Sequence, residues 1–515
     1  MKIIRNEQLK DVIPDGASIA CTGFSKSGIA YYVYKGIEDC FLEYGHPAGV
    51  IFNCNALGGI GEVGTYNDHF GPRGLVSAIR VAHITLAPRV NEQITKNEIP
   101  GHMYPLGVMA QLYRDMGAGK PGVISKVGLG TFADPRQEGG RMNEITQGDI
   151  ARVMEIDGEE WLFYPRFDLD VAIMRATYAD DRGNISFEKE PCLSDGFIAA
   201  QAVKANGGIV IVQVEDVVEY GSIPAREVEV PGFMVDYVVI APPEEHWQTA
   251  ATFYDPALCQ KERVDMKDIP VKPLDIRKII ARRSTMELRN GDMVNLGYGI
   301  PEMCGDVAAE EGIADEFTLT VECGLIGGVP CSGFDFGAAR NVDYVTDMVR
   351  MMDWYDSGGL DTSVLGAAEV DVAGNVNVTK FGSWTGPGGF INIVEGTKKN
   401  VFCGPLTAGG LKVAAENGKL RILEEGRKKK FVQTVEQISF NAERAKAAGH
   451  EVVYVTERAV FLLGDDGPVL TEIAPGIDLK TQVLDQIGFD IKIADDLKEM
   501  DPRIFTDAPM GLKHE

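Results

Sequence analysis

Long apolar runs alternate with helix-like stretches along this chain. Three runs are apolar almost without interruption, as in strands buried on both faces of a parallel sheet: GVIFNC (49–54), IVIVQV (209–214) and YVVIA (237–241). Residues 28–44 instead place six side chains on one face at helical spacing: Ile29, Val33, Ile37, Cys40, Phe41 and Tyr44. The pattern predicts an α/β fold with open, mostly parallel sheets, whose ligands bind beyond the carboxyl ends of the strands.

The chain also repeats itself in outline. Three segments of the first half match three of the second half in the same order: IPDGASIACTGF (13–24) with LRNGDMVNLGY (288–298), ADDRGNISF (179–187) with VDVAGNVNV (370–378), and DGFIAA (195–200) with GGFINI (388–393). Ordinary recurrence of βα turns is the alternative, but the shared order favours duplication of one α/β domain. We expect domains at 1–265 and 275–515, divided within the charged segment 262–275. The first domain carries extra material that includes residues 122–146.

Composition narrows the class of protein. The 515 residues carry a formal charge of −26, which argues against nucleic acid as a partner. No apolar run is long enough to span a membrane, and the N-terminal residues lack the apolar core of a signal peptide. The nine cysteines form no CxxC pair, so we expect a reducing, cytoplasmic location without disulfides or a zinc site.

One carboxylate is unusual in its position. In LTVECGLIGGVP (319–330) a strand-like run leads straight into Glu322, and a turn containing Gly324, Gly327 and Gly328 follows. A buried carboxylate is costly unless it is paired or put to use. The first half has Asn53 at the place aligned with Glu322, so a carboxylate in one half only indicates a site at the domain interface. A solvated glutamate at a strand end is the alternative.

A carboxylate among glycine amides suits acyl transfer. It can attack an activated acyl group, while nearby backbone N–H groups bind the oxyanion that develops. Two glycine clusters could supply such amides: NLGYGIP (295–301), with Gly297, Gly299 and Ile300, and TGPGGF (385–390), with Gly388 and Gly389. The first lacks the third glycine of a dinucleotide fingerprint, because Glu302 occupies that place. The second could equally be a plain turn.

Two further features have simple structural interpretations. Cys323 lies beside Glu322 without a neighbouring histidine or cation in the sequence, so we expect a small buried hydrophobe rather than a nucleophile. The basic run 427–430 has the charge to meet phosphate groups, but a solvated face is the simpler expectation.

Several longer motifs carry a resemblance to a known family. The chain resembles the class I (family I) coenzyme A transferases, and is most similar to single-chain propionate/acetate CoA-transferases, through VECGLIGGVP, GLGTFADPRQEGG, DWYDSGGLD, GNVNVTKF, GPGGFINI, FCGPLTAGGLK and TEIAPGIDL. The resemblance covers nearly the whole chain. It implies two related α/β domains, a homo-oligomer that is often a tetramer, and acyl-CoA and small carboxylic acids as substrates. It also implies that CoA is a substrate and that no metal, flavin or nicotinamide is held.

The resemblance further implies a mechanism and its residues. Glu322 occupies the position of the family's catalytic glutamate, which works in a ping-pong reaction through an acyl-glutamyl anhydride and a glutamyl-CoA thioester. The oxyanion would then meet the amides at 297–300 and 388–389. The acyl group would lie by Leu106 and Gly107, where the family usually has glutamine in place of Leu106. That departure, together with Ala-His-Ile instead of Gly-His-Trp at 82–84, predicts a different or larger acyl group.

Three other functions stay open at this level. Water could replace the acceptor acid, which would make the protein an acyl-CoA hydrolase of the same fold. A nicotinamide-dependent oxidoreductase is disfavoured by the incomplete glycine fingerprint. A silent binding subunit is disfavoured by Glu322 in its glycine-rich setting.

Overall fold

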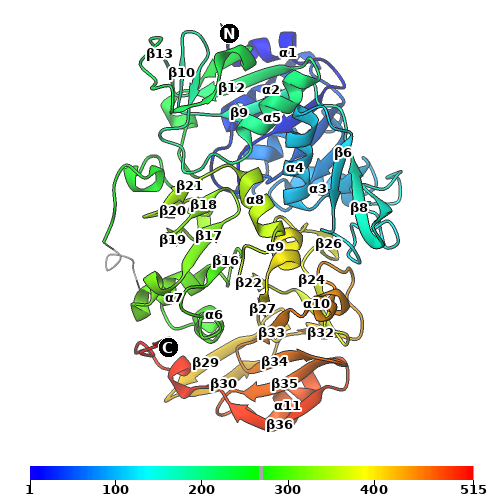
Figure 1. Ribbon diagram of the computed structural model, residues 1–515, viewed down its shortest axis with the longest axis vertical. Helices are drawn as coiled ribbons and strands as arrows, with labels where there is room; N and C mark the ends of the chain where they lie inside the picture. The colour runs from blue at the N-terminus through cyan, green and yellow to red at the C-terminus, as the bar shows by residue number, and fades with distance from the viewer. Residues whose placement is uncertain (266–270, 514–515) are drawn as a thin grey trace.

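The computed structural model describes residues 1–265 and 271–513. The expected domain boundary at 262–275 therefore includes residues 266–270, which lie outside the described part. Figure 1 shows the N-terminal half, blue to green, above the C-terminal half, green to red. Helices α8 (Met348–Asp356) and α9 (Phe390–Gly396) lie near the middle of the molecule, where the two halves meet.

The first half is built on an eight-stranded sheet in which every neighbouring pair is parallel. In spatial order its strands are β1 (Lys2–Ile3), β15 (Tyr237–Ile240), β12 (Ile209–Val214), β9 (Val171–Arg175), β2 (Ser18–Cys21), β3 (Val50–Cys54), β4 (Val76–Val81) and β5 (Gly101–Met103). The three apolar runs are confirmed as β3, β12 and β15, all inside this sheet. Most of their residues are buried, which explains why hydrophobicity does not alternate along them.

Helices cover this sheet. They are α1 (Leu9–Val12), α2 (Tyr31–Tyr44), α3 (Pro88–Thr95), α4 (Leu106–Gly117) and α5 (Gly196–Ala205). The helix expected at 28–44 is confirmed as α2, which buries Val33, Ile37 and Cys40. The placement of Tyr44 on the buried face is wrong, because Tyr44 is the last residue of the helix and 47% of it is exposed. Gly45 ends the helix in the left-handed conformation.

The second half is built on a ten-stranded sheet. In spatial order its strands are β21 (Tyr344–Val345), β18 (Leu325–Ile326), β17 (Thr318–Val321), β16 (Met293–Leu296), β22 (Thr362–Gly366), β27 (Lys399–Cys403), β33 (Glu451–Val455), β34 (Ala459–Gly464), β35 (Gly467–Ile473) and β36 (Lys492–Glu499). The centre, from β17 to β33, is parallel, and antiparallel pairs flank it on both sides. The other helices of this half are α6 (Ile276–Thr285), α7 (Met303–Glu311), α10 (Ala442–Ala448) and α11 (Leu479–Gln482).

Short strands complete the fold. The extra material of the first half begins with β6 (Gly122–Ser125), which pairs antiparallel with β8 (Glu159–Pro165), itself paired with β7 (Arg152–Ile156). The remaining strands form small sheets: β10 (Tyr178–Asp180), β11 (Ile185–Ser186), β13 (Asp216–Val218), β14 (Val228–Val230), β19 (Val329–Pro330), β20 (Ala339–Arg340), β23 (Glu369–Asp371), β24 (Val376–Asn377), β25 (Lys380–Phe381), β26 (Ser383–Trp384), β28 (Thr407–Ala408), β29 (Lys412–Glu416), β30 (Lys419–Glu424), β31 (Lys428–Lys429) and β32 (Phe431–Val432).

The two large sheets share one strand order. The order β3-β2-β9-β12-β15 in the first half recurs as β17-β16-β22-β27-β33 in the second. A second correspondence is local: Asp180 accepts hydrogen bonds from the backbone and side chain of Asn184, and Asp371 does the same with Asn375. This agreement supports the expected duplication, which stays a proposal together with the domain limits 1–265 and 275–515.

Polar contacts join the halves behind the site described below. On α4, Gln111 donates to Asp356 of α8 over 2.7 Å, and the backbone N–H of Gly107 donates to the Asn392 side chain of α9 over 2.9 Å. Asn392 in turn donates to Asp356 over 3.0 Å. The start of α4 and the start of α9 are therefore held together. None of the helices within the described residues combines the length and the apolar composition that crossing a membrane requires.

Candidate active site

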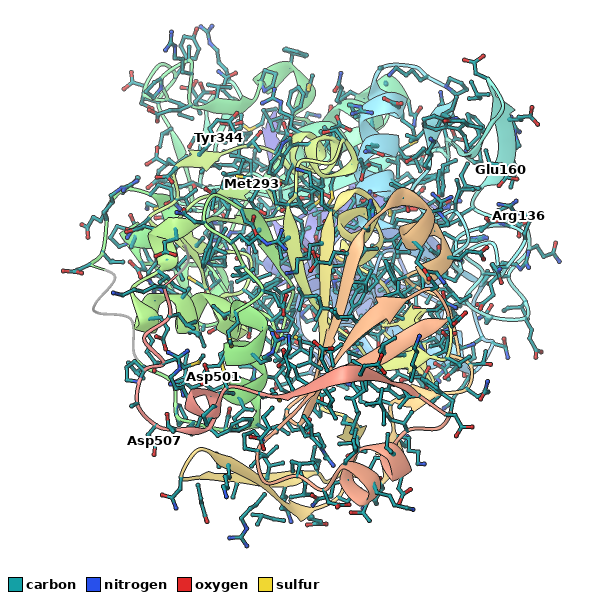
Figure 2. All side chains as sticks on the ribbon, turned by 60° about the horizontal axis from the view of Figure 1, so that its bottom comes forward. Arg136, Glu160, Met293, Tyr344, Asp501 and Asp507 are labelled. Atoms are coloured by element: carbon teal, nitrogen blue, oxygen red, sulfur yellow. The ribbon has the colours of Figure 1, made fainter. Side chains whose placement is uncertain are left out.

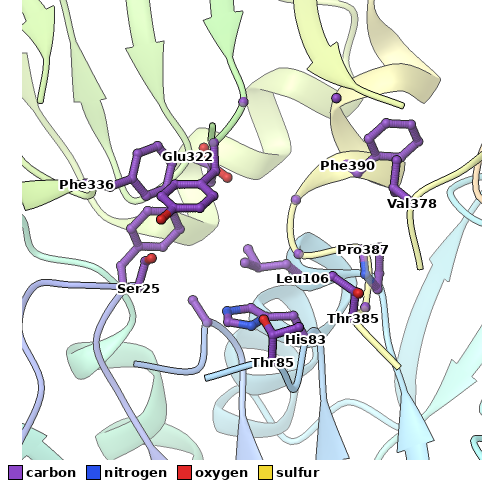
Figure 3. A pocket seen from close by; sticks show the side chains of 18 of the residues that line it. Ser25, His83, Thr85, Leu106, Glu322, Phe336, Val378, Thr385, Pro387 and Phe390 are labelled. Carbon is purple, nitrogen blue, oxygen red and sulfur yellow. The ribbon is translucent and has the colours of Figure 1, made fainter. Parts of the chain in front are cut away.

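A cavity of about 270 Å³ lies where the two halves meet. The first half contributes the loops that follow β2, β3 and β4 and the first residue of α4, while the second half contributes the ends of β16, β17 and β22 and the loop that leads into α9. Figure 3 shows Glu322 and Phe336 on one side of this cavity and His83, Leu106 and Thr385 facing them. The cavity thus lies beyond carboxyl ends of parallel strands, where ligands of α/β proteins bind.

Glu322 follows β17 directly and points into this cavity. Its side chain is buried, and burial raises the pKa of its carboxyl group above the ordinary value. The amide of Asn295, on the neighbouring strand β16, lies 3.5 Å from Glu322 Oε2 and opposes that rise. No cation pairs with Glu322 within the described residues, so the carboxylate is free to react.

A hydrogen-bonded cluster beneath Glu322 holds the side-chain amide of Asn295 in place. Tyr355 Oη, on α8, lies 2.7 Å from Thr320 Oγ1 and accepts from Asn295 Nδ2 over 3.2 Å. The Tyr355 hydroxyl is fully buried, which raises its pKa far above the usual range, so it stays neutral. The sequence alone did not identify Asn295 and Tyr355 as site residues. Burying the polar side chain of an asparagine inside the apolar strand MVNL costs free energy, and this could have indicated a role for Asn295.

The predicted oxyanion amides differ in availability. The N–H of Gly297 donates to Val364 O over 2.9 Å, and the N–H of Gly388 donates to Ala82 O over 2.9 Å. Both donors are therefore already used, although both residues line the cavity. The N–H of Gly389 has no hydrogen-bond partner within the described residues, and a Cβ built there would lie 3.2 Å from Glu322 Oε1. Of these three donors, Gly389 is therefore the one that is still available among the described residues, and its residue lies next to Glu322.

Gly299, Ile300 and Gly107 do not line the cavity, as far as the described residues show. Gly299 accepts a hydrogen bond from Arg277 over 3.0 Å through its carbonyl, and Ile300 packs against the core of the second half. Gly107 lies against the Asn392 side chain, where a Cβ would overlap it. These three residues lie beside the site rather than in it, whereas Leu106 lines the cavity wall.

The glycines after Glu322 shape the turn. Gly324, Gly327 and Gly328 all have positive φ, at 114°, 83° and 68°. A Cβ on Gly324 would overlap the carbonyl oxygen of Thr346, and one on Gly328 would overlap that of Arg340. Only glycine allows the chain to double back this tightly against 340–346. The turn therefore positions Glu322 without contributing atoms to the cavity.

The aligned partner of Glu322 in the first half is Asn55, not Asn53. Ala20 on β2 corresponds to Asn295 on β16. Ala20 pairs with Asn53 and Asn295 pairs with Thr320, so Asn53 corresponds to Thr320 and Asn55 corresponds to Glu322. Asn53 was aligned wrongly because strand register cannot be read from a short sequence match. Asn55 donates over 3.0 Å to a buried carboxylate, that of Asp195, which stands where the second half has Gly388. The first half therefore lacks an open carboxylate at this place.

Two polar residues of the cavity escaped the sequence reasoning. The buried Lys26 donates to the carbonyl of Gly59, and its Nζ lies 5.9 Å from the ring centroid of Tyr298. Burial lowers the pKa of Lys26 to about 8. His83 is half-buried and follows β4. The signal in the sequence for Lys26 was a single lysine in the stretch GFSKSG. For His83 the signal was the segment 82–84, which differs from the usual Gly-His-Trp of the family at the residues on either side of the histidine.

The structure agrees with Cys323 as a buried apolar residue and with the basic run 427–430 as a mostly solvated face. Cys323 is fully buried, and burial raises the pKa of its thiol well above the usual range. Arg427, Lys428 and Lys429 are exposed, whereas Lys430 is only partly so. Across 1–265 and 271–513, no three histidine, cysteine or acidic side chains come together as ligands for a metal ion.

A strand-end carboxylate beside an unpaired amide, in a cavity with apolar walls, has the parts of an acyl-transfer enzyme. Comparison with known proteins gives the family. The "Coenzyme A transferase" family model matches residues 5–241. The chain is 43% identical to the caffeate CoA-transferase of Acetobacterium woodii, over 99% of this chain and 98% of that protein. It is 40% identical to the acetate CoA-transferase YdiF of Escherichia coli K12, over 99% and 96%.

A solved structure agrees with this result. The acyl-CoA transferase YdiF of Escherichia coli O157:H7, crystallised as a thioester complex with CoA, superposes with a TM-score of 0.93 at 38% identity. The match covers 100% of this chain and 98% of that one. The chain therefore belongs to the coenzyme A transferase family, as its motifs predict, and is an enzyme of that class.

Proposed function

We propose that this enzyme transfers CoA from a short-chain acyl-CoA to a carboxylic acid, with Glu322 as the covalent carrier. The observation that carries the proposal is the position of Glu322, which is buried in the cavity next to Gly389. Among the described residues no cation pairs with Glu322 and the N–H of Gly389 has no partner. A free carboxylate is the nucleophile that the reaction needs, and a fixed amide can stabilise the oxyanion.

The proposed reaction is a ping-pong exchange in which each bond broken is matched by one formed. A carboxylate oxygen of Glu322 attacks the thioester carbonyl, and the carbon–sulfur bond breaks to leave an acyl-glutamyl anhydride and CoA thiolate. The thiolate attacks the glutamyl carbonyl, and the anhydride C–O bond breaks to leave a glutamyl-CoA thioester and the free acid. A second carboxylate then reverses both steps. No net proton transfer is required.

The names of the two similar CoA-transferases concern the identity of the acceptor acid. Their names include acetate in one case and caffeate in another, so acids of very different size are handled by proteins about equally similar to this one. We propose an acetate- or propionate-like acceptor. The E. coli relative was obtained as a thioester complex with CoA, which supports a covalent CoA intermediate here.

Acyl-CoA hydrolysis is the alternative with the same fold. The test is the rate of acyl-CoA consumption with and without a panel of carboxylic acids. A transferase releases a new acyl-CoA and speeds up with the acceptor, whereas a hydrolase releases free CoA at a rate that the acids leave unchanged. A nicotinamide-dependent reaction would appear in neither arm and would instead require added NAD(P)H.

Leu106→Gln tests the acyl pocket. Leu106 lines the cavity at the start of α4, and its N–H donates to Gly388 O over 3.1 Å. A glutamine amide there makes the wall polar, so kcat/KM is expected to shift toward the smallest acids. One misplaced polar or apolar group is worth about 1–3 kcal/mol, or roughly 10- to 200-fold. An unchanged ranking of acceptor acids would remove Leu106 from the acyl pocket.

Assembly and location complete the proposal. We propose a homo-oligomer, in keeping with the tetramers expected of this family, working in the cytoplasm on acyl-CoA and small acids. Size-exclusion chromatography with light scattering measures the assembly directly. A strictly monomeric active enzyme would contradict it.

A further inference from the structure

A second cavity lies in the first half, apart from the catalytic one. Its volume is about 130 Å³, and it lies beyond the carboxyl ends of β9, β12 and β15, where ligands of parallel sheets bind. Among the described residues, none that lines the catalytic cavity also lines this one. One water occupies roughly 30 Å³ in the liquid, so the cavity has room for a larger guest.

The imidazole of His246, in the wall of this cavity, has an unused N–H. The side-chain oxygen of Gln213 accepts from the backbone N–H groups of Tyr32 and Val33, over 3.0 and 3.3 Å, which fixes the orientation of its amide. The Gln213 amide nitrogen therefore faces His246 Nδ1, at 3.2 Å. An amide nitrogen only donates, so Nδ1 accepts and the imidazole proton lies on Nε2. Nε2 has no hydrogen-bond partner within the described residues.

Glu190 supplies an unused acceptor beside that donor. Arg175 Nε donates to Glu190 Oε1 over 3.2 Å. Glu190 Oε2 lies 3.1 Å from the same nitrogen but accepts no hydrogen bond in the described part of the chain. His246 Nε2 lies 3.9 Å from Glu190 Oε1, too far for a hydrogen bond. Only 6% of Glu190 and 8% of His246 is exposed, so a ligand that pairs with both groups recovers free energy lost on their burial.

The cations of this cavity are already paired. Lys189 Nζ donates to both carboxylate oxygens of Glu215 over 2.8 Å, and Arg175 is paired with Glu190. An anionic ligand would have to displace a carboxylate that is in place, and a cationic ligand would have to displace a lysine or an arginine. The cavity therefore favours a neutral ligand.

The exposed part of the wall is aromatic. Phe253 and Tyr254 line the cavity with 52% and 41% of each residue exposed, and such rings stack on a planar guest. A neutral planar heterocycle with an exocyclic amine beside a ring nitrogen meets all of these features. The amine can donate to Glu190 Oε2, and the ring nitrogen can accept from His246 Nε2. Adenine has such an edge.

We propose that this cavity binds an adenine ring, with its amine on Glu190 and a ring nitrogen on His246. The site lies outside the catalytic cavity and goes beyond the proposed function. Free adenine nucleotides and CoA both carry this ring, so the experiment has separate arms for the two sources.

Calorimetric titration of the full-length enzyme with adenine, purine and 6-dimethylaminopurine tests the amine. Purine lacks the amine and 6-dimethylaminopurine lacks its N–H. Both should bind about 10- to 100-fold more weakly than adenine, the size of one hydrogen bond to a charged group. AMP and desulfo-CoA then compete with adenine. Displacement by AMP alone identifies a free nucleotide as the source, and displacement by desulfo-CoA as well identifies CoA.

Three variants locate the binding. His246→Phe removes the donor and should lower the affinity for adenine about 10-fold. Tyr254→Ala removes a stacking ring at an exposed position and should lower it about 5- to 100-fold. Tyr344→Ala is the matched control, because Tyr344 is an exposed tyrosine on β21 of the second half, outside this cavity (Figure 2). It should leave the affinity unchanged.

Three outcomes would overturn the inference. Adenine that does not bind would leave the cavity to water. Purine that binds as well as adenine would exclude the amine contact with Glu190. An affinity that His246→Phe and Tyr254→Ala both leave unchanged would place the binding elsewhere. If His246→Phe does not fold, the exposed Tyr254→Ala variant and its control decide the location.

Discussion

Glu322→Gln is expected to abolish both CoA transfer and the covalent CoA adduct. The amide oxygen is a poor nucleophile, while the side chain keeps its shape in the cavity and its contact with Asn295. Incubating wild-type enzyme with acyl-CoA and no acceptor should leave a glutamyl-CoA thioester. Borohydride reduces a thioester to an alcohol, which inactivates the enzyme and lightens the peptide that spans residues 318–330. Peptide mass spectrometry reads the site directly.

Controls separate this prediction from general damage. Wild-type enzyme without acyl-CoA carries a free carboxylate and should resist borohydride. Glu322→Asp pulls the attacking oxygen back by about 1 Å, a displacement that costs on the order of 100-fold in rate. Modification of Cys323 or of a lysine instead, or transfer by Glu322→Gln at the wild-type rate, would overturn the assignment.

The same carboxyl group sets a pH dependence. Burial raises the pKa of Glu322, and only the ionised form is a nucleophile. We therefore expect kcat/KM for acyl-CoA to fall as the pH is lowered through that raised pKa, with one proton taken up. The pH profile of Glu322→Asp should be displaced if this group is the one that titrates. A flat profile down to the ordinary range of glutamate would contradict it.

Gly389→Pro is expected to lower kcat by about 100- to 1,000-fold. Proline removes the N–H of Gly389, which has no partner among the described residues and belongs to a residue next to Glu322. The φ of Gly389 is −78°, which proline adopts without strain, so the fold should survive. Loss of a single oxyanion donor is worth about 2.7–4 kcal/mol in other enzymes. Affinity for CoA, measured by calorimetry, should change far less than kcat.

Gly389→Ala is the matched control. It keeps the N–H and adds a Cβ that would lie 3.2 Å from Glu322 Oε1 and 3.3 Å from Ile393 Cδ1. The difference in kcat between the alanine and proline variants isolates the amide from the added bulk. Thermal unfolding of both checks that they fold. Equal activity of the two variants would exclude this amide from the mechanism.

Local patterns in the sequence were enough to predict the α/β class and its mostly parallel sheets. Uninterrupted apolar runs predict buried parallel strands, because a strand covered on both faces has no polar side, and β3, β12 and β15 are where those runs lie. The sequence also predicted the place of Glu322 between a strand and a glycine turn, because the strand and the turn are next to each other in the chain.

Tertiary structure decided which atoms are free to act. Gly388 and Gly389 are indistinguishable in the sequence. In the structure Gly388 N donates to Ala82 O, about 300 positions away, whereas Gly389 N has no partner in the described part of the chain. The exchange of Asn53 for Asn55 has the same cause, since register depends on strands that lie far apart in sequence. Lys26 and His83 line the same cavity as Glu322 only because the tertiary fold brings together loops of the two halves, and no local pattern encodes that arrangement.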